Sequence, residues 1–244
     1  MKLVLDLGNT FQKYAVFSED EIVKYGAPEQ ISQKLLLGLF DRFSINSAII
    51  SSVVHHDKQI ESVIGSRCRC VKLGRETSLP LKNKYETPET LGYDRLAAAV
   101  AGNYLFPGKD VLVIDAGTCL KFDFVNSQSE YLGGAISPGL HMRFEALHTF
   151  TEKLPLVEAA DFNWLTGKNT SDSILSGVMN GTLAEIEGII DRYKEIYPEI
   201  QIVLSGGDAE YLVSKLKNRI FAHSNVVLTG LKIILDHNDK QNSI

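Results

Sequence analysis

Short apolar runs, separated by turn residues, dominate the first part of the chain. Several runs have the length of a β-strand, and the Gly8-Asn9 pair after the first run favours a tight turn. Leucines at helical spacing in 29–42 predict an amphipathic helix. The predicted elements are strands at 2–7, 12–17, 21–25, 47–53 and 69–72, with helices at 29–42 and 57–65.

The same order of elements recurs in the second half, after a helix predicted at about 93–106. The predicted elements there are strands at 111–115, 119–125, 130–136 and 201–204, a helix that begins at Gly139, a long helix at about 171–197 and two C-terminal helices. The segment FPGKD between the halves is a turn and no long linker. The pattern therefore predicts an α/β protein of two similar lobes, 1–109 and 110–244, with a cleft between them.

A strand that ends in aspartate and runs into a glycine turn occurs once in each half. LVLDLGNT contains Asp6, and VLVIDAGT contains Asp115. Such a turn points backbone N–H groups outward and adds a hydroxyl, which together form a phosphate cradle, while the aspartate is placed to hold a hydrated cation. A single copy is most simply a hairpin, but two copies in repeated lobes favour a grip on the β- and γ-phosphates of ATP.

Composition and charge narrow the class of protein. The 244 residues are 44% hydrophobic and 23% charged, as in an ordinary globular protein, and the net charge of -5 argues against nucleic acid and membranes as partners. No uncharged apolar run approaches the roughly 18 residues that span a bilayer. Three cysteines give no even disulfide framework, and no secretion signal is evident at the N-terminus. These features predict a reduced, cytoplasmic protein with inert cysteines.

Six further motifs follow one another along the chain. They are YETPETLGYDR (85–95), DAGT (115–118), YLGGAISPGL (131–140), EKLP (152–155), GKNTSDSILSG (167–177) and SGGDA (205–209). Each motif alone is weak, but their common order is specific. With the duplicated turns, the chain resembles the type III pantothenate kinases of the actin, hexokinase and heat-shock-chaperone ATPase superfamily. The resemblance covers nearly the whole chain and implies two ribonuclease H-like lobes with a nucleotide cleft between them.

The resemblance implies phosphorylation of pantothenate by ATP, the first step of coenzyme A biosynthesis, by a homodimer. The first phosphate loop would comprise Asp6, Leu7, Gly8, Asn9, Thr10, Phe11, Gln12 and Lys13. Thr118 would contact ATP in the second loop, and Gly206 and Gly207 would let adenosine lie against bare backbone. Asp115 would hold a monovalent cation, K⁺ or NH₄⁺, and Asp6 would hold Mg²⁺ through water.

The resemblance also implies an acceptor site. Pantothenate would be surrounded by Tyr85, Gly92, Tyr93, Asp94, Arg95 and Thr170. Asp94 would accept a proton, and Arg95 would offer a forked donor to the pantothenate carboxylate. Plainer interpretations remain open for some of these residues, since Asp94 and Thr170 are also residue types that cap helices.

Two stretches depart from the family pattern. Cys119-Leu120-Lys121 stands where small residues and threonines are usual, and His141-Met142-Arg143 stands where small polar residues are common. Lys121 either reaches a phosphate or is an exposed strand residue, and the second interpretation is favoured.

Two other functions compete with pantothenate kinase. The first is a kinase of another small hydroxy acid on the same fold. The second is a nucleotide-gated protein that binds ATP and transfers nothing. The presence of both Asp94 and Arg95 counts against the second.

Overall fold

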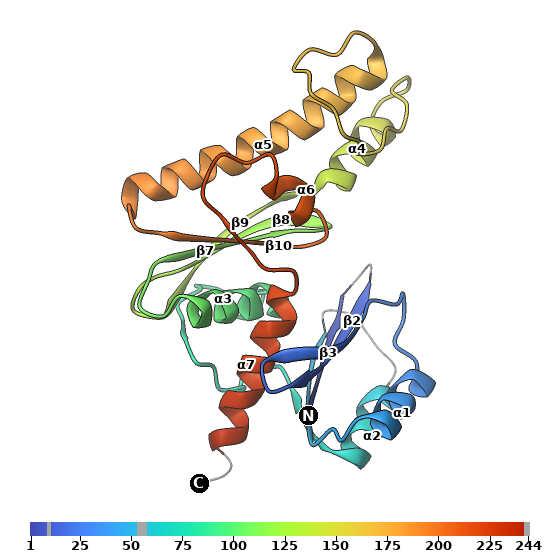
Figure 1. Ribbon diagram of the computed structural model, residues 1–244, viewed down its shortest axis with the longest axis vertical. Coiled ribbons are helices and arrows are strands. Elements are labelled where there is room, and N and C mark those ends of the chain that lie inside the picture. The colour runs from blue at the N-terminus through green and yellow to red at the C-terminus, as the bar shows by residue number, and fades with distance from the viewer. Residues whose placement is uncertain (9–10, 53–57, 242–244) are drawn as a thin grey trace. The chain divides into compact units, whose positions relative to one another are not determined.

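The computed structural model describes residues 1–8, 11–52 and 58–241 (Figure 1). The chain forms two compact units. Unit 1 is Met1–Pro107, Ser129–Leu132 and Asn225–Ile244, and unit 2 is Gly108–Gln128 and Gly133–Ser224. The chain thus leaves unit 1 near the predicted division at 109, builds unit 2, and returns to unit 1 with its last helix. The division of site residues between lobes 1–109 and 110–244 stays a prediction.

Unit 1 is built on a five-stranded sheet in the order β3-β2-β1-β4-β5. Its elements are β1 (Lys2–Leu7), β2 (Gln12–Ser18), β3 (Glu21–Gly26), α1 (Gln33–Arg42), β4 (Ser47–Ser52), α2 (Lys58–Arg67) and β5 (Arg69–Lys72). β1 pairs antiparallel with β2 and parallel with β4. Leucines of β1 pack with Leu36 of α1 and Ile64 of α2 in the core. Helix α1 begins later than predicted because the Ser32 hydroxyl caps it, accepting a hydrogen bond from the Leu35 N–H at 3.2 Å.

The second sheet has the order β11-β10-β7-β8-β9-β6. Its strands are β6 (Lys82–Asn83), β7 (Val111–Ala116), β8 (Cys119–Val125), β9 (Glu130–Pro138), β10 (Gln201–Ser205) and β11 (Phe221–Ala222). Its strands β9-β8-β7-β10-β11 have the same arrangement as the strands β3-β2-β1-β4-β5 of unit 1. In both sets, the first strand in the sequence lies between the second and the fourth. The prediction of two similar α/β lobes is therefore confirmed.

Three helices belong to unit 2: α4 (Leu140–Thr149), α5 (Thr170–Ile196) and α6 (Ala209–Val213). Ile186 and Ile190 of α5 are fully buried, in a core shared with Ile114 of β7 and Phe122 of β8. Among the described helices, none combines the length and the hydropathy that crossing a membrane requires.

Helices α3 (Tyr93–Leu105) and α7 (Val226–Gln241) pack against each other in unit 1 (Figure 1). The α3 face is rich in buried alanine, which allows close approach of α7. Salt bridges also join α7 to the first strands. Lys2 of β1 pairs with Asp236 and, at 2.8 Å, with Asp239. Lys232 pairs with Asp20 and, at 2.8 Å, with Asp236.

The sequence prediction missed β6 and β11. Each has only two residues, which is too short for any period to be visible. β6 exists because Lys82 and Asn83 pair in parallel register with Glu130 and Tyr131 of β9.

Candidate active site

The first predicted phosphate loop connects β1 to β2 in unit 1. Asp6 is in register with Lys13 of β2 on one side and with Ser51 of β4 on the other. Residues paired in this way project to the same face of a sheet, so the three form a row, here called the unit 1 row. Ser51 is fully buried, and its hydroxyl makes no hydrogen bond to any described residue.

Side chains of the first loop differ in their surroundings. Leu7 is fully buried in the core, and the buried Gln12 side chain accepts a hydrogen bond from the Ile31 N–H at 2.6 Å. Phe11 is exposed. Asn9 and Thr10 lie outside the described residues. Because the side chains of Leu7 and Gln12 point into the interior, only the backbone N–H groups of these two residues are suited to bind a phosphate.

Unit 2 contains the equivalent row at its own first strand. Asp115 of β7 is in register with Lys121 of β8 and with Ser205 of β10. The Lys121 Nζ lies 2.7 Å from Asp115 Oδ2, and the two side chains are only 17% and 15% exposed. The prediction that Lys121 is an exposed strand residue is wrong, because its register places it beside a partly buried carboxylate.

The second phosphate turn is packed against two glycine backbones. The Gly139 N–H donates to the Thr118 carbonyl at 3.2 Å, and a Cβ on Gly139 would lie 2.1 Å from the Gly117 carbonyl oxygen. Gly206 has φ = 102°, and a Cβ there would lie 2.1 Å from the Ala116 carbonyl oxygen. Only glycine allows this approach. The backbone of the turn is thereby fixed, while the Thr118 side chain stays exposed.

The segment predicted to receive adenosine lies immediately after β10. Gly207 is exposed, and no heavy atom lies within 4 Å of the position that its Cβ would take. The next residue, Asp208, donates its N–H to the Ala116 carbonyl at 3.1 Å. Burial raises the pKa of the Asp208 carboxyl, although His141 acts in the opposite direction. The open backbone at Gly207 suits a flat ligand.

Helix α3 places Asp94 in its first turn, behind the N-cap Gly92. Asp94 is therefore not the N-cap, and the plainer interpretation of this residue is wrong. A Cβ on Gly92 would lie 2.5 Å from Asp94 Oδ1, so the glycine leaves the space that the carboxylate uses. The helix N-terminus favours the ionised form of an acid in this position.

Arg95 is buried, with 5% of its surface exposed. Its guanidinium carbon lies 5.6 Å from the centre of the Tyr85 ring, and Tyr85 stacks on Tyr131 with ring centres 6.1 Å apart. The sequence by itself indicates no chemistry for Tyr85 and gives no sign of Tyr131 as its neighbour. The structure makes both aromatic rings supports of the arginine.

Thr170 is the first residue of α5, in unit 2, and its side chain is exposed. The cap is Asn169, whose Oδ1 accepts from the Asp172 N–H at 2.9 Å, so the interpretation of Thr170 as the cap is wrong. The other predicted acceptor residues belong to unit 1. That Thr170 joins them around one ligand stays a prediction.

Arg143, in the second stretch that departs from the family, has a structural role. Its Nε donates to the Pro138 carbonyl at 2.7 Å, and its Nη2 donates to the Ser137 hydroxyl at 2.6 Å and to the Glu185 carboxylate of α5. The residue thus holds the start of α4 against α5 within unit 2.

The cysteines of the chain are free thiols. Burial raises the pKa of Cys68 and of Cys70 to about 11, so both stay protonated at neutral pH. The prediction of inert cysteines is supported for these two. Within the described part of the chain, no group of three or more His, Cys, Asp or Glu side chains forms a metal site.

The two implied cations fit their predicted ligands differently. Asp6 is half-buried at a strand end and shares its row with the buried Ser51 hydroxyl, which suits water-mediated contact with Mg²⁺. Asp115 is already paired with the ammonium of Lys121. Two like unit charges 4 Å apart repel by roughly 4 kcal/mol near a protein surface. The residues at Asp115 therefore do not fit a separate monovalent cation.

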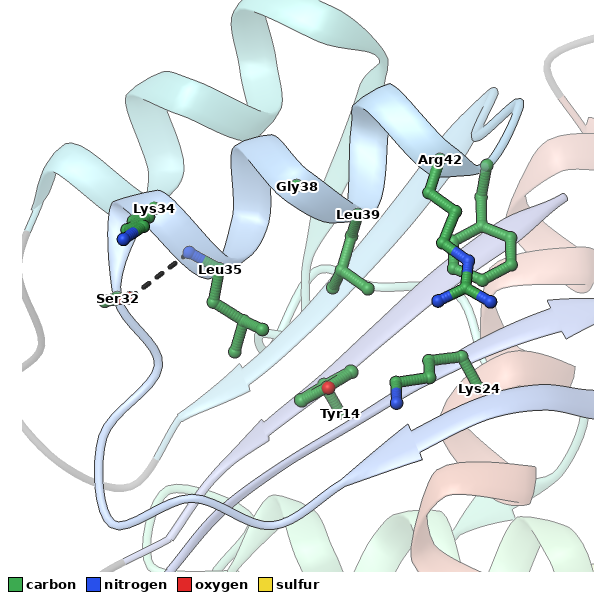
Figure 2. Close-up of a pocket in the computed structure, with 9 residues that line it drawn as sticks. Tyr14, Lys24, Ser32, Lys34, Leu35, Gly38, Leu39 and Arg42 are labelled. Atoms are coloured by element: carbon green, nitrogen blue, oxygen red, sulfur yellow. Dashed lines mark hydrogen bonds between the residues drawn. The ribbon is translucent and has the colours of Figure 1, made fainter.

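A groove elsewhere in unit 1 lies between α1 and strands β2 and β3, with a volume of about 460 Å³ (Figure 2). Lys24, Lys34 and Arg42 give it positive charge, Leu39 lines it from the α1 side, and Tyr14 lines it from the side of the strands. No predicted site residue lines this groove.

Known proteins resemble this chain in sequence and in fold. The chain is 42% identical to a type III pantothenate kinase of Christiangramia forsetii, over 99% of this chain and 100% of that protein. Among solved structures, it is similar to a conserved protein of Campylobacter jejuni described as a Baf family transcriptional activator (19% identity, TM-score 0.59, 98% of this chain and 99% of that one).

It is also similar to ADP-bound MreB5 of Spiroplasma citri (14% identity, TM-score 0.52, 99% and 98%). These two likenesses show the fold alone, and they agree with the predicted two-lobed class. The family profile described as type III pantothenate kinase matches residues 2–192. The chain belongs to the type III pantothenate kinase family.

Proposed function

We propose that this chain transfers the γ-phosphoryl group of ATP to pantothenate, giving 4'-phosphopantothenate in the first step of coenzyme A biosynthesis. Family membership supports a phosphotransferase that uses a nucleotide with a divalent metal ion. The observation that carries the proposal is the N-terminus of α3, where Asp94 and Arg95 present a carboxylate and a guanidinium on consecutive residues.

Asp94 is proposed as the proton acceptor. The hydroxyl oxygen of pantothenate forms a bond to the γ-phosphorus, the bond from that phosphorus to the bridging oxygen breaks, ADP leaves, and the hydroxyl proton passes to Asp94. The transition state of phosphoryl transfer is loose, so most of the catalysis comes from positioning and charge. The position of Asp94 in the first turn of α3 supports this role, because a helix N-terminus stabilises a negative charge.

Arg95 is proposed to bind the pantothenate carboxylate. A guanidinium is always charged, and its planar fork matches a carboxylate. Tyr85 supports this role by lying across the guanidinium. Tyr93, Gly92 and Thr170 are proposed to complete the acceptor site.

The two turns are proposed to bind ATP. Asp6 to Lys13 would contact phosphates in the first turn and Thr118 in the second, while Gly206 and Gly207 would receive adenosine. Asp6 would hold Mg²⁺ through water, and the bound ion would neutralise phosphate charge. The resemblance also implies K⁺ or NH₄⁺ at Asp115, and the pairing of that carboxylate with Lys121 argues against it.

A homodimer in the cytoplasm is proposed as well. The proposal rests on the family resemblance. Light scattering should then give about twice the 27.0 kDa chain mass. A fully active monomer would refute the dimer.

The decisive experiment is ADP release by the purified protein with Mg-ATP and a panel of hydroxy acids and sugars. Pantothenate should give the highest rate, with 4'-phosphopantothenate as the product. Release with another acceptor and none with pantothenate would favour a kinase of a different small hydroxy acid. ATP binding with no acceptor in the panel phosphorylated would favour a nucleotide-gated binding protein.

A further inference from the structure

We infer that the Lys121 ammonium supplies the positive charge beside the second phosphate turn, in place of a bound monovalent cation. The inference rests on the proposed function, since it concerns how the same turn binds ATP. It predicts a kinase that works without added potassium or ammonium.

The first argument is the geometry of the pair. Lys121 and Asp115 are directly opposite in the β7–β8 ladder, and their charged atoms are 2.7 Å apart. Both side chains are mostly covered, so the ammonium is held in place. The turn between the two strands is fixed by the backbones of Gly139 and Gly206. The Lys121 ammonium is thus a cation that the protein itself holds beside the turn.

The second argument is chemical equivalence. Ammonium is one of the two ions that the family resemblance implies, and a lysine side chain ends in a substituted ammonium. Asp115 with the Lys121 ammonium has the same net charge as Asp115 with one bound potassium ion. The replacement therefore leaves the charge beside the phosphates unchanged.

The third argument comes from unit 1. Lys13 occupies the equivalent register position opposite Asp6. No ion pair joins Lys13 to any residue that the structure describes. Register alone therefore does not create the pair, and the contact between Lys121 and Asp115 is specific to unit 2.

The first experiment uses the unmodified protein. Rates of ADP formation and the Kd of Mg-ADP, measured by calorimetry, are compared in potassium, ammonium, sodium and choline chloride at one ionic strength. Constant ionic strength is needed because salt screens charge. Both quantities should agree within about twofold in all four salts, since the Lys121–Asp115 pair would present the same charge to the phosphates in each of them. Values that improve about tenfold or more in potassium or ammonium would overturn the inference.

The second experiment replaces the lysine. Lys121→Met should lose at least about tenfold in rate and in Mg-ADP affinity in choline and sodium, and potassium or ammonium should restore both. A variant unaffected in every salt, or one weakened in every salt without rescue, would overturn the inference. Lys72→Met is the matched control, because Lys72 forms an exposed pair with Glu61 at 2.7 Å outside the site. It should behave as the unmodified protein.

The outcomes separate the two proposals. Absence of Mg-ADP binding in every salt would contradict the proposed function, whereas binding that requires potassium would contradict only the role of Lys121. If Lys121→Met does not fold, the salt series on the unmodified protein still decides the inference.

Discussion

Unit 1 and unit 2 use the same order of five strands, yet they differ at the end of the first strand. In unit 1, Asp6 lies opposite Lys13, which forms no ion pair with any described residue. In unit 2, Asp115 lies opposite Lys121 and is paired with it. The duplicated strands therefore place an aspartate opposite a lysine in both units, but the two residues form an ion pair only in unit 2.

The units also differ outside the strands that they share. The α3 N-terminus of unit 1 carries Asp94 and Arg95, and the segment after β10 in unit 2 carries Gly206 and Gly207. The proposed function assigns acceptor chemistry to the first and adenosine to the second. Substitutions in unit 1 test the acceptor chemistry, and substitutions in unit 2 test whether its turn is fixed by the glycine backbone.

Asp94→Asn should have the largest effect and tests the chemistry assigned to unit 1. Asparagine keeps the shape of the side chain but does not accept the proton. A positioned general base contributes ~10²–10⁴ in rate, so kcat should fall by about that factor. The affinity for Mg-ADP, measured by calorimetry, should stay unchanged because the proposed nucleotide contacts are elsewhere. A near-normal kcat would remove Asp94 from the mechanism.

Arg95→Ala should mainly weaken acceptor binding. A hydrogen bond to a charged group is worth roughly 1.5–3 kcal/mol, which corresponds to a rise in the KM for pantothenate of about 10- to 150-fold. Circular dichroism must first show that the variant folds, because Arg95 is buried. Tyr85→Ala should give a smaller rise in the same KM, since it removes only the support. An unchanged KM in a folded Arg95→Ala enzyme would contradict the carboxylate contact.

Gly206→Ala and Gly207→Ala form a matched pair in unit 2. Alanine at 206 would have φ = 102° and would contact the Ala116 backbone, whereas the space at 207 is open. Strained backbone of this kind costs of order 1–3 kcal/mol, so Gly206→Ala should lower the free energy of unfolding by at least that amount. Gly207→Ala should change it little in urea titrations. Equal effects would show that the turn is not clamped as described.

High pH should weaken the packing of α7 within unit 1. Of the four predicted effects, this one should be the smallest. Burial acts to lower the pKa of Lys232, but hydrogen bonds to Asp20 and Asp236 outweigh it and raise the pKa above 10.5. The stabilisation is therefore complete below pH 10.5 and is lost as the pH rises through the raised folded-state pKa.

The measurement is the free energy of unfolding as a function of pH. The difference between the unmodified protein and Lys232→Met should shrink as the pH rises through this range. A difference that stays constant would show that this ion pair does not support the helix.

Local patterns predicted most of the fold. Runs of apolar residues located the main strands, and the repeated Asp-x-Gly turns marked the end of the first strand in each unit. The patterns could not show that Lys121 pairs with Asp115, because that contact depends on cross-strand register. They also could not show that Asn169, rather than Thr170, caps α5, since both residue types favour caps.

Contacts between distant parts of the sequence leave no local signal. Tyr131 supports Tyr85, and through it Arg95, only because β9 runs beside the two-residue strand β6. The return of α7 to unit 1 likewise depends on packing against α3 and on charges in β1. The hydrophobic periodicity within either segment does not identify those partners.

The placement of α7 has a consequence for how the polypeptide is made. Lys2 bonds to Asp236, a partner 234 positions further along. Ribosomes add about 5–20 residues per second, so roughly 10–50 s separate the synthesis of these partners. During that interval all segments of unit 2 are synthesised, while the alanine-rich face of α3 is not yet covered by α7. The N-terminal unit is therefore the last to be completed, although its synthesis begins first.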